Sequence, residues 1–289
     1  MDCELWKSIT AQIRAVDRNY RRRKAARKFT HSVGKIVWVY LWSVFNDRPV
    51  YWACKAENYR GVRQPRSLPD QSCMSRRLRS HHTHKFIRAV IQRLTDKKRG
   101  RLIKAIDGKP LPISKITSDP DASYGRGAGG IDKGYKLHAI CSVFNEPIAW
   151  EVQPINISEK AVAKTLINQL YDEGYLLADS NYDTKKLHRA AANHGHQLVA
   201  SRRKPGTSLW HNRQPRSRLR SIELLEGGGE FGRNLFKIRK RIEGYFGNLS
   251  ADRIDLPPWV RRLHRVRLFV DAKLLIRAAR QKQIRSPAA

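Results

Sequence analysis

The stretches LIKAID at residues 102–107 and YLLAD at residues 175–179 decide the fold of this chain. Each is a short apolar run of strand length that ends in an aspartate. Between them, alternating polarity at residues 135–143 and the run IAWEVQPI at residues 148–155 predict two further strands. The segment 102–200 is therefore expected to form an α/β domain around a sheet.

The rest of this segment supplies helices and a fifth strand. Ser158 precedes an amphipathic helix of about 14 residues, Asp183 precedes the next helix, and QLVA at residues 197–200 predicts the fifth strand. The order strand, strand, strand, helix, strand, helix, strand is that of the ribonuclease H-like fold, in which the first and fourth strands are neighbours. Because ligands collect beyond strand ends in such mixed sheets, Asp107 and Asp179 are expected to converge.

The segments on either side are mainly helical. Residues 1–98 predict a basic helical region, in which Asp70 N-caps a helix over residues 71–80 that carries several arginines. An amphipathic helix over residues 84–94 follows, so the pair resembles a helix-turn-helix unit. In the second half, residues 201–232 predict a basic, glycine-rich loop, and residues 257–289 a C-terminal helix that packs on the α/β domain over residues 99–256.

Charge is the second informative feature of the sequence. The 289 residues hold 58 Lys and Arg against 25 Asp and Glu, a formal net charge of +33, which favours nucleic acid or an anionic membrane as partner. The longest apolar run, residues 36–45, is about half of the ~20 residues that a membrane span needs. No signal-peptide pattern is present, and four scattered cysteines fit a reducing cytoplasm.

The excess of positive charge is confined to the two ends of the chain. Residues 1–100 hold 24 Lys and Arg against 7 Asp and Glu, whereas residues 101–200 hold 12 against 11. Two interpretations remain open at this point. In the first, the acids of the middle third hold metal while the basic flanks bind nucleic acid. In the second, the middle third is merely the packed core.

A third carboxylate, Glu243, lies on a helix predicted over residues 235–249, four residues after Arg239. The ordinary interpretation is a surface ion pair on a helix. Phosphodiester chemistry gives another, since two Mg²⁺ ions about 3.5–4 Å apart need several carboxylate ligands. The rival acids Asp119, Asp121 and Asp132 lie in a loop, where aspartates usually form turns.

Four motifs, in this order, resemble DDE transposases of the IS4/IS5-like insertion-sequence superfamily. They are AIDGKPL at residues 105–111, KGYKLH at 133–138, LLADSNY at 176–182, and Phe-x-x-Arg-x-x-x-Glu followed by Phe-Gly-Asn-Leu at 236–249. The resemblance covers about residues 100–280. It implies a ribonuclease H-like catalytic domain, with the N-terminal helical region binding DNA.

The resemblance also implies a set of functional residues. Asp107, Asp179 and Glu243 are expected to be catalytic and to hold two Mg²⁺ ions, with Mn²⁺ as a substitute, and Arg239 is expected to assist them. The residues expected to bind DNA are Arg76, Arg77, Arg79, Arg202, Arg203, Lys204 and Arg239, with Arg213, Arg216, Arg218 and Arg220 as further phosphate contacts. Two positions depart from the family pattern: Phe236 stands where the family has Tyr, and Ser250 where it has Lys.

The expected function is metal-dependent strand cleavage at transposon ends, followed by strand transfer into target DNA. The implied partner is double-stranded DNA, bound by a homodimer in the cytoplasm at the nucleoid, with no membrane role. Two alternatives stay open: a ribonuclease H-like nuclease without strand transfer, and a non-catalytic, decayed basic DNA-binding protein.

Overall fold

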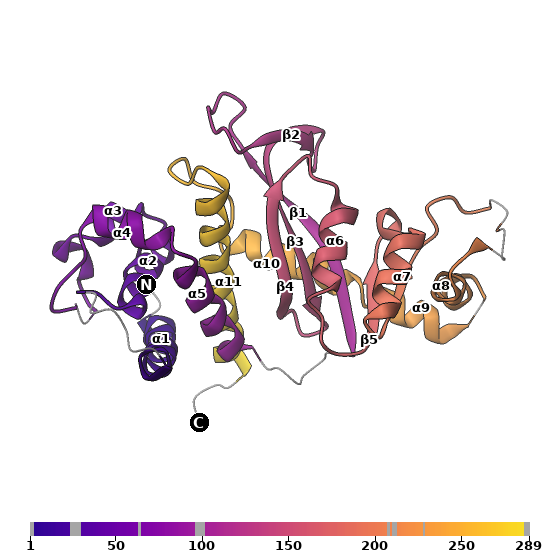
Figure 1. The fold of residues 1–289 in the computed structure, drawn as a ribbon, viewed down its shortest axis with the longest axis horizontal. Helices are drawn as coiled ribbons and strands as arrows, with labels where there is room; N and C mark the ends of the chain where they lie inside the picture. Colours follow the sequence, from indigo (N-terminus) through magenta and orange to yellow (C-terminus); the bar gives the residue numbers. More distant parts are fainter. Residues whose placement is uncertain are drawn as a thin grey trace. The chain divides into compact units, whose positions relative to one another are not determined.

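The computed structural model describes residues 3–23, 30–62, 65–95, 102–206, 209, 213–227 and 229–285. The chain divides into two compact units (Figure 1). The central unit is Lys97–Leu256, and the terminal unit combines Met1–Asp96 with Pro257–Ala289. The boundary expected at residues 98/99 lies outside the described residues.

The central unit is built on a six-stranded mixed sheet. Its strands are β1 (Ile103–Ile113), β2 (Ser123–Arg126), β3 (Ile131–Ser142), β4 (Pro147–Pro154), β5 (Gly174–Ala178) and β6 (His196–Ala200). β1 is central: it pairs antiparallel with β3 on one side and parallel with β5 on the other. β2 and β4 both pair with β3, and β6 extends the sheet beyond β5.

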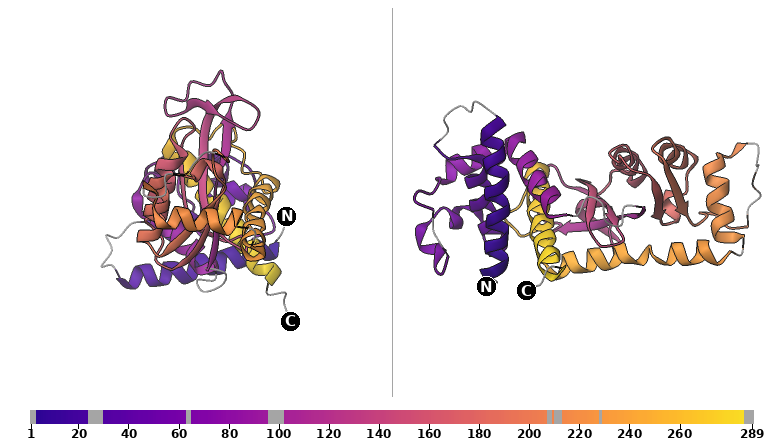
Figure 2. Two further views of the ribbon diagram at one scale, coloured as in Figure 1. Left: turned by 90° about the vertical axis from the view of Figure 1, so that its right-hand side faces the viewer. Right: turned by 90° about the horizontal axis from the view of Figure 1, so that it is seen from below.

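Helices cover both faces of this sheet (Figures 1 and 2). On one face α6 (Glu159–Ile167) and α7 (Lys185–Asn193) bury a core that includes Ile106 and Ile140 from the sheet. On the other face α10 (Lys240–Ala251) packs against β1. Side chains alternate along a strand, so Asp107 and Lys109 point away from the α6 side. Lys109 Nζ donates a hydrogen bond to Ser250 Oγ of α10 at 2.7 Å, which agrees with this direction.

The structure differs from the sequence expectations at several places in the central unit. β1 does not end at Asp107 but runs on to Ile113, because β3 continues to pair with it. The loop expected before β3 contains β2, and α6 has nine residues instead of about 14.

The expected loop over residues 201–232 contains a helix, α8 (Arg216–Glu226), and the start of α9 (Glu230–Lys237). Its residues 207–208, 210–212 and 228 lie outside the described part of the chain. The single helix expected over residues 235–249 is two helices, because α9 ends at Lys237 and α10 begins at Lys240.

The terminal unit is helical where it is described. Its helices are α1 (Cys3–Arg23), α2 (Val33–Phe45), α3 (Val50–Ala53), the 3-10 turn η1 (Ala56–Tyr59), α4 (Gln71–Leu78), α5 (His81–Leu94) and α11 (Leu263–Arg285). α2 is buried on almost all sides, and its Trp38 and Trp42 stack with Tyr59. Asp70 caps α4 as expected, with its side chain accepting the Cys73 N–H.

α11 packs with helices of the terminal unit, and the expectation that residues 257–289 also pack on the α/β domain stays a prediction. The helix contacts α5, α1 and α2. α11 is buried around most of its circumference, and its Val266, Val270 and Leu274 are fully buried. Among the described helices, none combines the length and the apolar character that crossing a membrane requires.

Candidate active site

The backbone brings Asp107 and Asp179 opposite one another. β1 and β5 pair in parallel register from Ile103 with Tyr175 to Ala105 with Leu177. Two residues further along each strand come Asp107 and Asp179, so the register that pairs the strands also pairs the acids. Asp107 thus lies inside β1 but beyond the end of its ladder with β5, and Asp179 directly follows β5.

Neither carboxylate has a cationic partner within ion-pair distance in the described part of the chain. Asp107 Oδ1 accepts the N–H of Gly108 at 2.8 Å. Asp179 caps the turn η2 (Ser180–Tyr182), and its Oδ1 accepts the N–H of Asn181 at 2.8 Å. Backbone donors therefore hold the two carboxylates in place without neutralising them.

The pKa values of Asp107 and Asp179 are both raised, mainly by burial, which no ion pair in the described part of the chain offsets. The pKa of Asp107 is raised to about 6. Burial is the largest cause and the charge of Asp179 adds to it, while the Gly108 N–H and Arg239 act in the opposite direction. Burial also raises the pKa of Asp179, as does the charge of Glu159, while the Asn181 N–H and Arg239 lower it. A cation bound between these two carboxylates would stabilise their charged forms and so lower both pKa values.

Arg239 and Glu243 occupy the junction between α9 and α10. Arg239 is the N-cap residue of α10, and its Nη2 donates to Glu243 Oε1 at 2.7 Å. The guanidinium also lies over the ring of Phe236, 5.9 Å from the centroid. The charge of Arg239 acts on both Asp107 and Asp179, so this junction lies close to the acidic pair.

The structure unites the four expected catalytic residues only in part. Asp107, Asp179 and Arg239 interact electrostatically, and Glu243 joins them through its bond to Arg239, with a side chain that is 51% exposed. Among the described residues, no three His, Cys, Asp or Glu side chains are arranged to hold one ion. The donor set nevertheless fits a divalent cation, because two partly buried carboxylates that repel one another are ligands of the kind Mg²⁺ prefers.

Glu159 is an acid of this site that sequence reasoning missed. It lies in the first turn of α6, and its charge raises the pKa values of Asp107 and Asp179. Lys136 Nζ of β3 binds its Oε1 at 2.7 Å. Gly108 leaves room for this ion pair, since a Cβ there would lie 3.1 Å from Cδ of Lys136. Its position in the sequence could have indicated it, because Glu159, like Asp179, comes shortly after a predicted strand.

Asp183 plays a different part from the one its position suggested. Thr184, not Asp183, caps α7. Asp183 instead accepts two hydrogen bonds from Arg218 of α8, at 2.7 Å each, and lies 3.2 Å from Nε2 of His188. Arg218 is thus engaged inside the protein and is not available as the phosphate contact that the sequence suggested.

The other predicted DNA-binding residues differ in availability. Arg202 is mostly buried and pairs with Glu226 at 3.1 Å, whereas the side chains of Arg203 and Lys204 are exposed. In the terminal unit, Arg76 and Arg79 are exposed on and just after α4, and Arg77 is half-buried.

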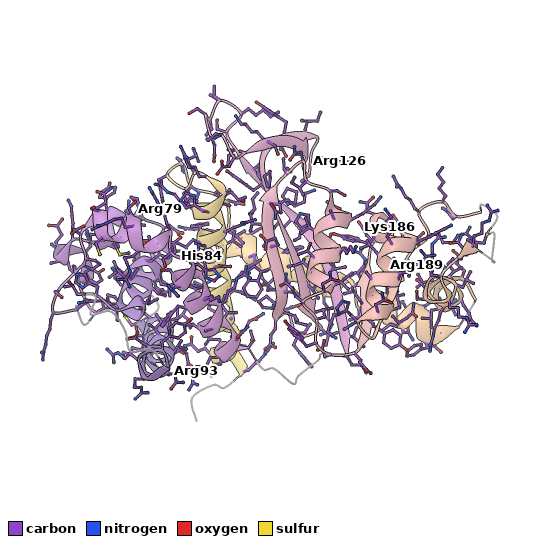
Figure 3. The ribbon with its side chains drawn as sticks, in the orientation of Figure 1. Arg79, His84, Arg93, Arg126, Lys186 and Arg189 are labelled. Carbon is purple, nitrogen blue, oxygen red and sulfur yellow. The ribbon has the colours of Figure 1, made fainter. Side chains whose placement is uncertain are left out.

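Three exposed cations of the central unit were not selected from the sequence: Arg126 on β2, and Lys186 and Arg189 on α7 (Figure 3). None of these three forms an ion pair with a described residue.

Among the rival acids, buried Asp119 accepts a hydrogen bond from the Tyr135 hydroxyl at 2.8 Å and so holds its loop.

Comparison with known proteins places this site in a family. Residues 98–256 match the family model described as the transposase DDE domain, and this span contains Asp107, Asp179, Arg239 and Glu243. No curated protein gives a match. A solved structure, the piggyBac transposase synaptic complex with hairpin DNA, is similar over 99% of this chain and 82% of that one. Its TM-score of 0.36 at 11% identity is too low to support an argument about fold or function.

The family assignment therefore depends on the domain match. The matched span is more than half of the 289 residues and covers almost the whole central unit. The acids that the sheet brings together all fall within it. The chain belongs to the transposase family defined by the DDE domain.

Proposed function

We propose that this protein is a DNA transposase that cuts DNA at transposon ends and joins the freed 3′-hydroxyl to target DNA. The observation that carries the proposal is the pairing of Asp107 with Asp179 at the end of the β1–β5 ladder, without a cationic partner in the described structure. Membership of the transposase family supports it. The strand order β4-β3-β1-β5-β6, with two helical crossovers, supports a ribonuclease H-like fold for the central unit.

Asp107, Asp179 and Glu243 would hold the metal, two Mg²⁺ ions or Mn²⁺ in their place. When bound, the ions would supply activation of the attacking oxygen and stabilisation of the leaving one. Asp107 and Asp179 present their carboxylates from backbone positions fixed by the sheet register. Glu243, half exposed on the first turn of α10, would complete the ligand set.

The positive residues of the site would orient the acids and the DNA. Arg239 holds Glu243 and lowers the pKa values of both aspartates, so it keeps the acids ionised for metal binding. Lys109, bound to Ser250, places a cation beside the position where the family pattern has lysine. Its amino group is suited to a phosphate contact there.

The exposed basic residues would bind double-stranded DNA, with the terminal unit contacting the transposon ends and the central unit contacting DNA near the acids. The exposed members of the expected set are Arg76 and Arg79 of the terminal unit, and Arg203, Lys204, Arg213, Arg216 and Arg220 of the central unit. Because transposition joins two ends, we infer a homodimer on DNA, working in the cytoplasm at the nucleoid.

The test is cleavage of a plasmid that carries the DNA flanking the coding sequence, with Mg²⁺, with Mn²⁺ or with EDTA. The wild-type protein should cut only with a divalent ion. Asp107→Asn should cut roughly 10³-fold more slowly, since metal stabilisation of the transition state is worth several kcal/mol. Asp132→Asn, which changes a rival acid outside the pair, is the matched control.

Three outcomes would contradict parts of this proposal. Full cutting by Asp107→Asn would remove the assigned site. Cutting without joining of a pre-cut end would leave a nuclease. Metal-independent DNA binding with no cutting under any condition would leave a non-catalytic DNA-binding protein.

A further inference from the structure

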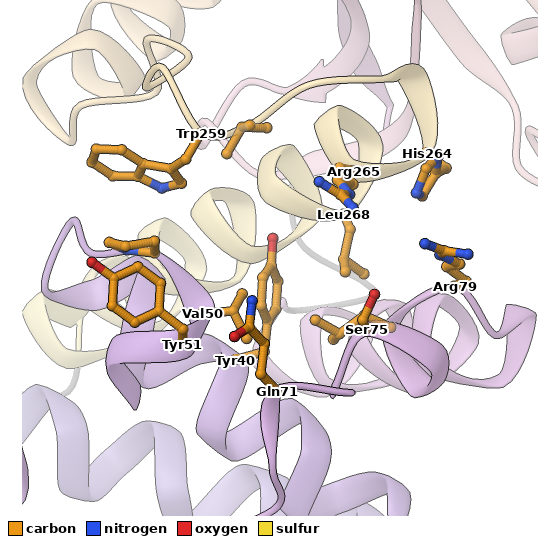
Figure 4. Close-up of a pocket in the computed structure, with 13 residues that line it drawn as sticks. Tyr40, Val50, Tyr51, Gln71, Ser75, Arg79, Trp259, His264, Arg265 and Leu268 are labelled. Carbon is orange, nitrogen blue, oxygen red and sulfur yellow. The ribbon is translucent and has the colours of Figure 1, made fainter. Parts of the chain in front are cut away.

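A cavity whose described lining lies entirely in the terminal unit, whereas the DDE acids belong to the central unit, has the chemistry of a nucleotide site. It has a volume of about 280 Å³ and lies between the α2–α3 segment, α4 and the start of α11 (Figure 4). This size is near the lower end of ligand pockets, which begin at roughly 300 Å³. It suits one planar ring system with its attached sugar at the mouth.

One end of the cavity is aromatic. Tyr51 and Trp259 both lie at this end (Figure 4). Both residues are solvent-accessible, since Tyr51 is 52% exposed and Trp259 is 43% exposed. Exposed aromatic rings of this kind stack on bases, because every base has a π-face.

The other end of the cavity is cationic. Arg79 and Arg265 line it from opposite sides, next to His264 (Figure 4). Both arginine side chains are exposed, and neither forms an ion pair with a residue of the described structure. Guanidinium groups bind phosphate oxygens through two parallel hydrogen bonds.

Polar groups lie between the two ends, and acids are absent from the described lining. Gln71 and Ser75 of α4 offer amide and hydroxyl groups that match base edges. Tyr40 forms part of the lining from α2, and burial raises the pKa of its phenol, which remains a neutral donor. No Asp or Glu lines the cavity, so nothing in the lining repels a phosphate.

We infer that this cavity binds a single unpaired nucleotide of DNA, with its base against Tyr51 and Trp259 and a phosphate on Arg79 and Arg265. The net charge of +33 and the acid-free lining favour a polyanion over a peptide. An aromatic end favours a base out of the stack over a paired one, whose faces are covered by its neighbours. The inference rests on the proposed function for its ligand, DNA, but uses residues outside the DDE site.

The experiment measures binding of the full-length protein to three matched duplexes by fluorescence anisotropy. One carries a single bulged 2-aminopurine, one carries the same base paired, and one carries a bulged abasic sugar. The bulged base should bind roughly tenfold more tightly than the other two, a difference of about 1.4 kcal/mol, because it alone offers an unpaired base that stacks on the rings. Its fluorescence should also be quenched on binding.

Variants then assign the preference to this cavity. The double variant Tyr51→Ala/Trp259→Ala should lose the tenfold preference and the quenching. The double variant Arg79→Ala/Arg265→Ala should weaken binding of the bulged duplex while leaving 2-aminopurine partly quenched. Tyr171→Ala removes an aromatic ring that is 97% exposed in the central unit, and serves as the matched control.

The outcomes separate this inference from the proposed function. Equal binding of all three duplexes, or a preference that survives loss of both rings, overturns the nucleotide site. A bulged abasic sugar bound as tightly as the bulged base also overturns it, because the base then contributes nothing. If Asp107→Asn abolishes plasmid cutting while these results are negative, the transposase proposal stands and only the cavity's role falls.

Discussion

Asp179 and Asp183 lie four residues apart on the same connection, yet their surroundings are opposite. Asp179 has backbone donors only, and its pKa is raised by burial and by the charge of Glu159. For Asp183, burial alone would raise the pKa, but hydrogen bonds from Arg218 and His188 outweigh it and hold the pKa well below its usual range. One carboxylate is left uncompensated, and the other is satisfied on every side.

The difference separates Asp179, an acid of the candidate active site, from Asp183, whose ion pair with Arg218 is a structural clamp. A buried carboxylate without a cation costs stability, and proteins retain such groups where function needs them. A carboxylate bound by an arginine fork joins distant segments, here α8 to the turn after β5. Asp183 thus holds in place the connection on which Asp179 is presented.

The largest effect expected from this comparison follows removal of the clamp. Arg218→Ala leaves Asp183 buried without its main partner and should lower the free energy of unfolding by about 3–5 kcal/mol. Arg218→Lys restores the charge but not the fork, and should recover part of the loss. Urea denaturation measures both.

The pH dependence of the clamp gives a second readout. The pKa of Asp183 is depressed in the folded state, so its contribution is present above the ordinary value of 3.8 and is lost as pH falls toward the folded value. The gap between wild type and Arg218→Ala should therefore close in acid. Equal stability of the two proteins at pH 7 would show that the clamp is not structural.

Neutralising the uncompensated acid should have a smaller effect of opposite sign. The pKa of Asp107 rises from 3.8 to about 6 on folding, so stability falls as pH rises between these values and the full cost applies above about 6. At pH 7.5 without divalent ions, Asp107→Asn should be about 1–2 kcal/mol more stable than wild type, allowing for partial exposure.

The same variant tests metal binding without any activity assay. Mg²⁺ should raise the stability of wild type and of the control Asp132→Asn, but not that of Asp107→Asn. If Asp107→Asn is less stable than wild type at pH 7.5, the carboxylate of Asp107 stabilises the fold and is not an uncompensated acid.

The smallest stability effect is expected at Glu243. Its ion pair with Arg239 is half exposed and spaced i, i+4, so Glu243→Gln should change the free energy of unfolding by less than about 0.5 kcal/mol. Plasmid cutting should nevertheless fall roughly a hundredfold or more if Glu243 completes the metal ligands. Unchanged cutting would leave Glu243 as the surface partner of Arg239.

Local patterns in the sequence predicted much of this molecule. The apolar runs before Asp107 and Asp179 indicated two strands, and the cap at Asp70 marked the start of α4. These features depend on neighbours within a few residues, which a single sequence displays.

Features that depend on distant partners were not predictable. Asp183 and Thr184 are both good helix caps, and only Arg218, 35 residues later, decides that Thr184 takes the role. Glu159 enters the site because α6 folds back over the sheet beside Lys136. Likewise, no Gly or Pro announces the break at Arg239 between α9 and α10.

The terminal unit is assembled from both ends of the chain, whereas the central unit is one continuous segment. During synthesis, domains fold as units in the order in which they emerge from the ribosome. Helices α1 to α5 emerge before the central unit, but α11, which packs on α5, is translated after it. The central unit is thus able to close its core while the terminal unit still lacks a helix. The cavity between α4 and α11 is complete only once residues 259–268 have been translated, so a chain that stops before Leu263 would have the acids but not this cavity.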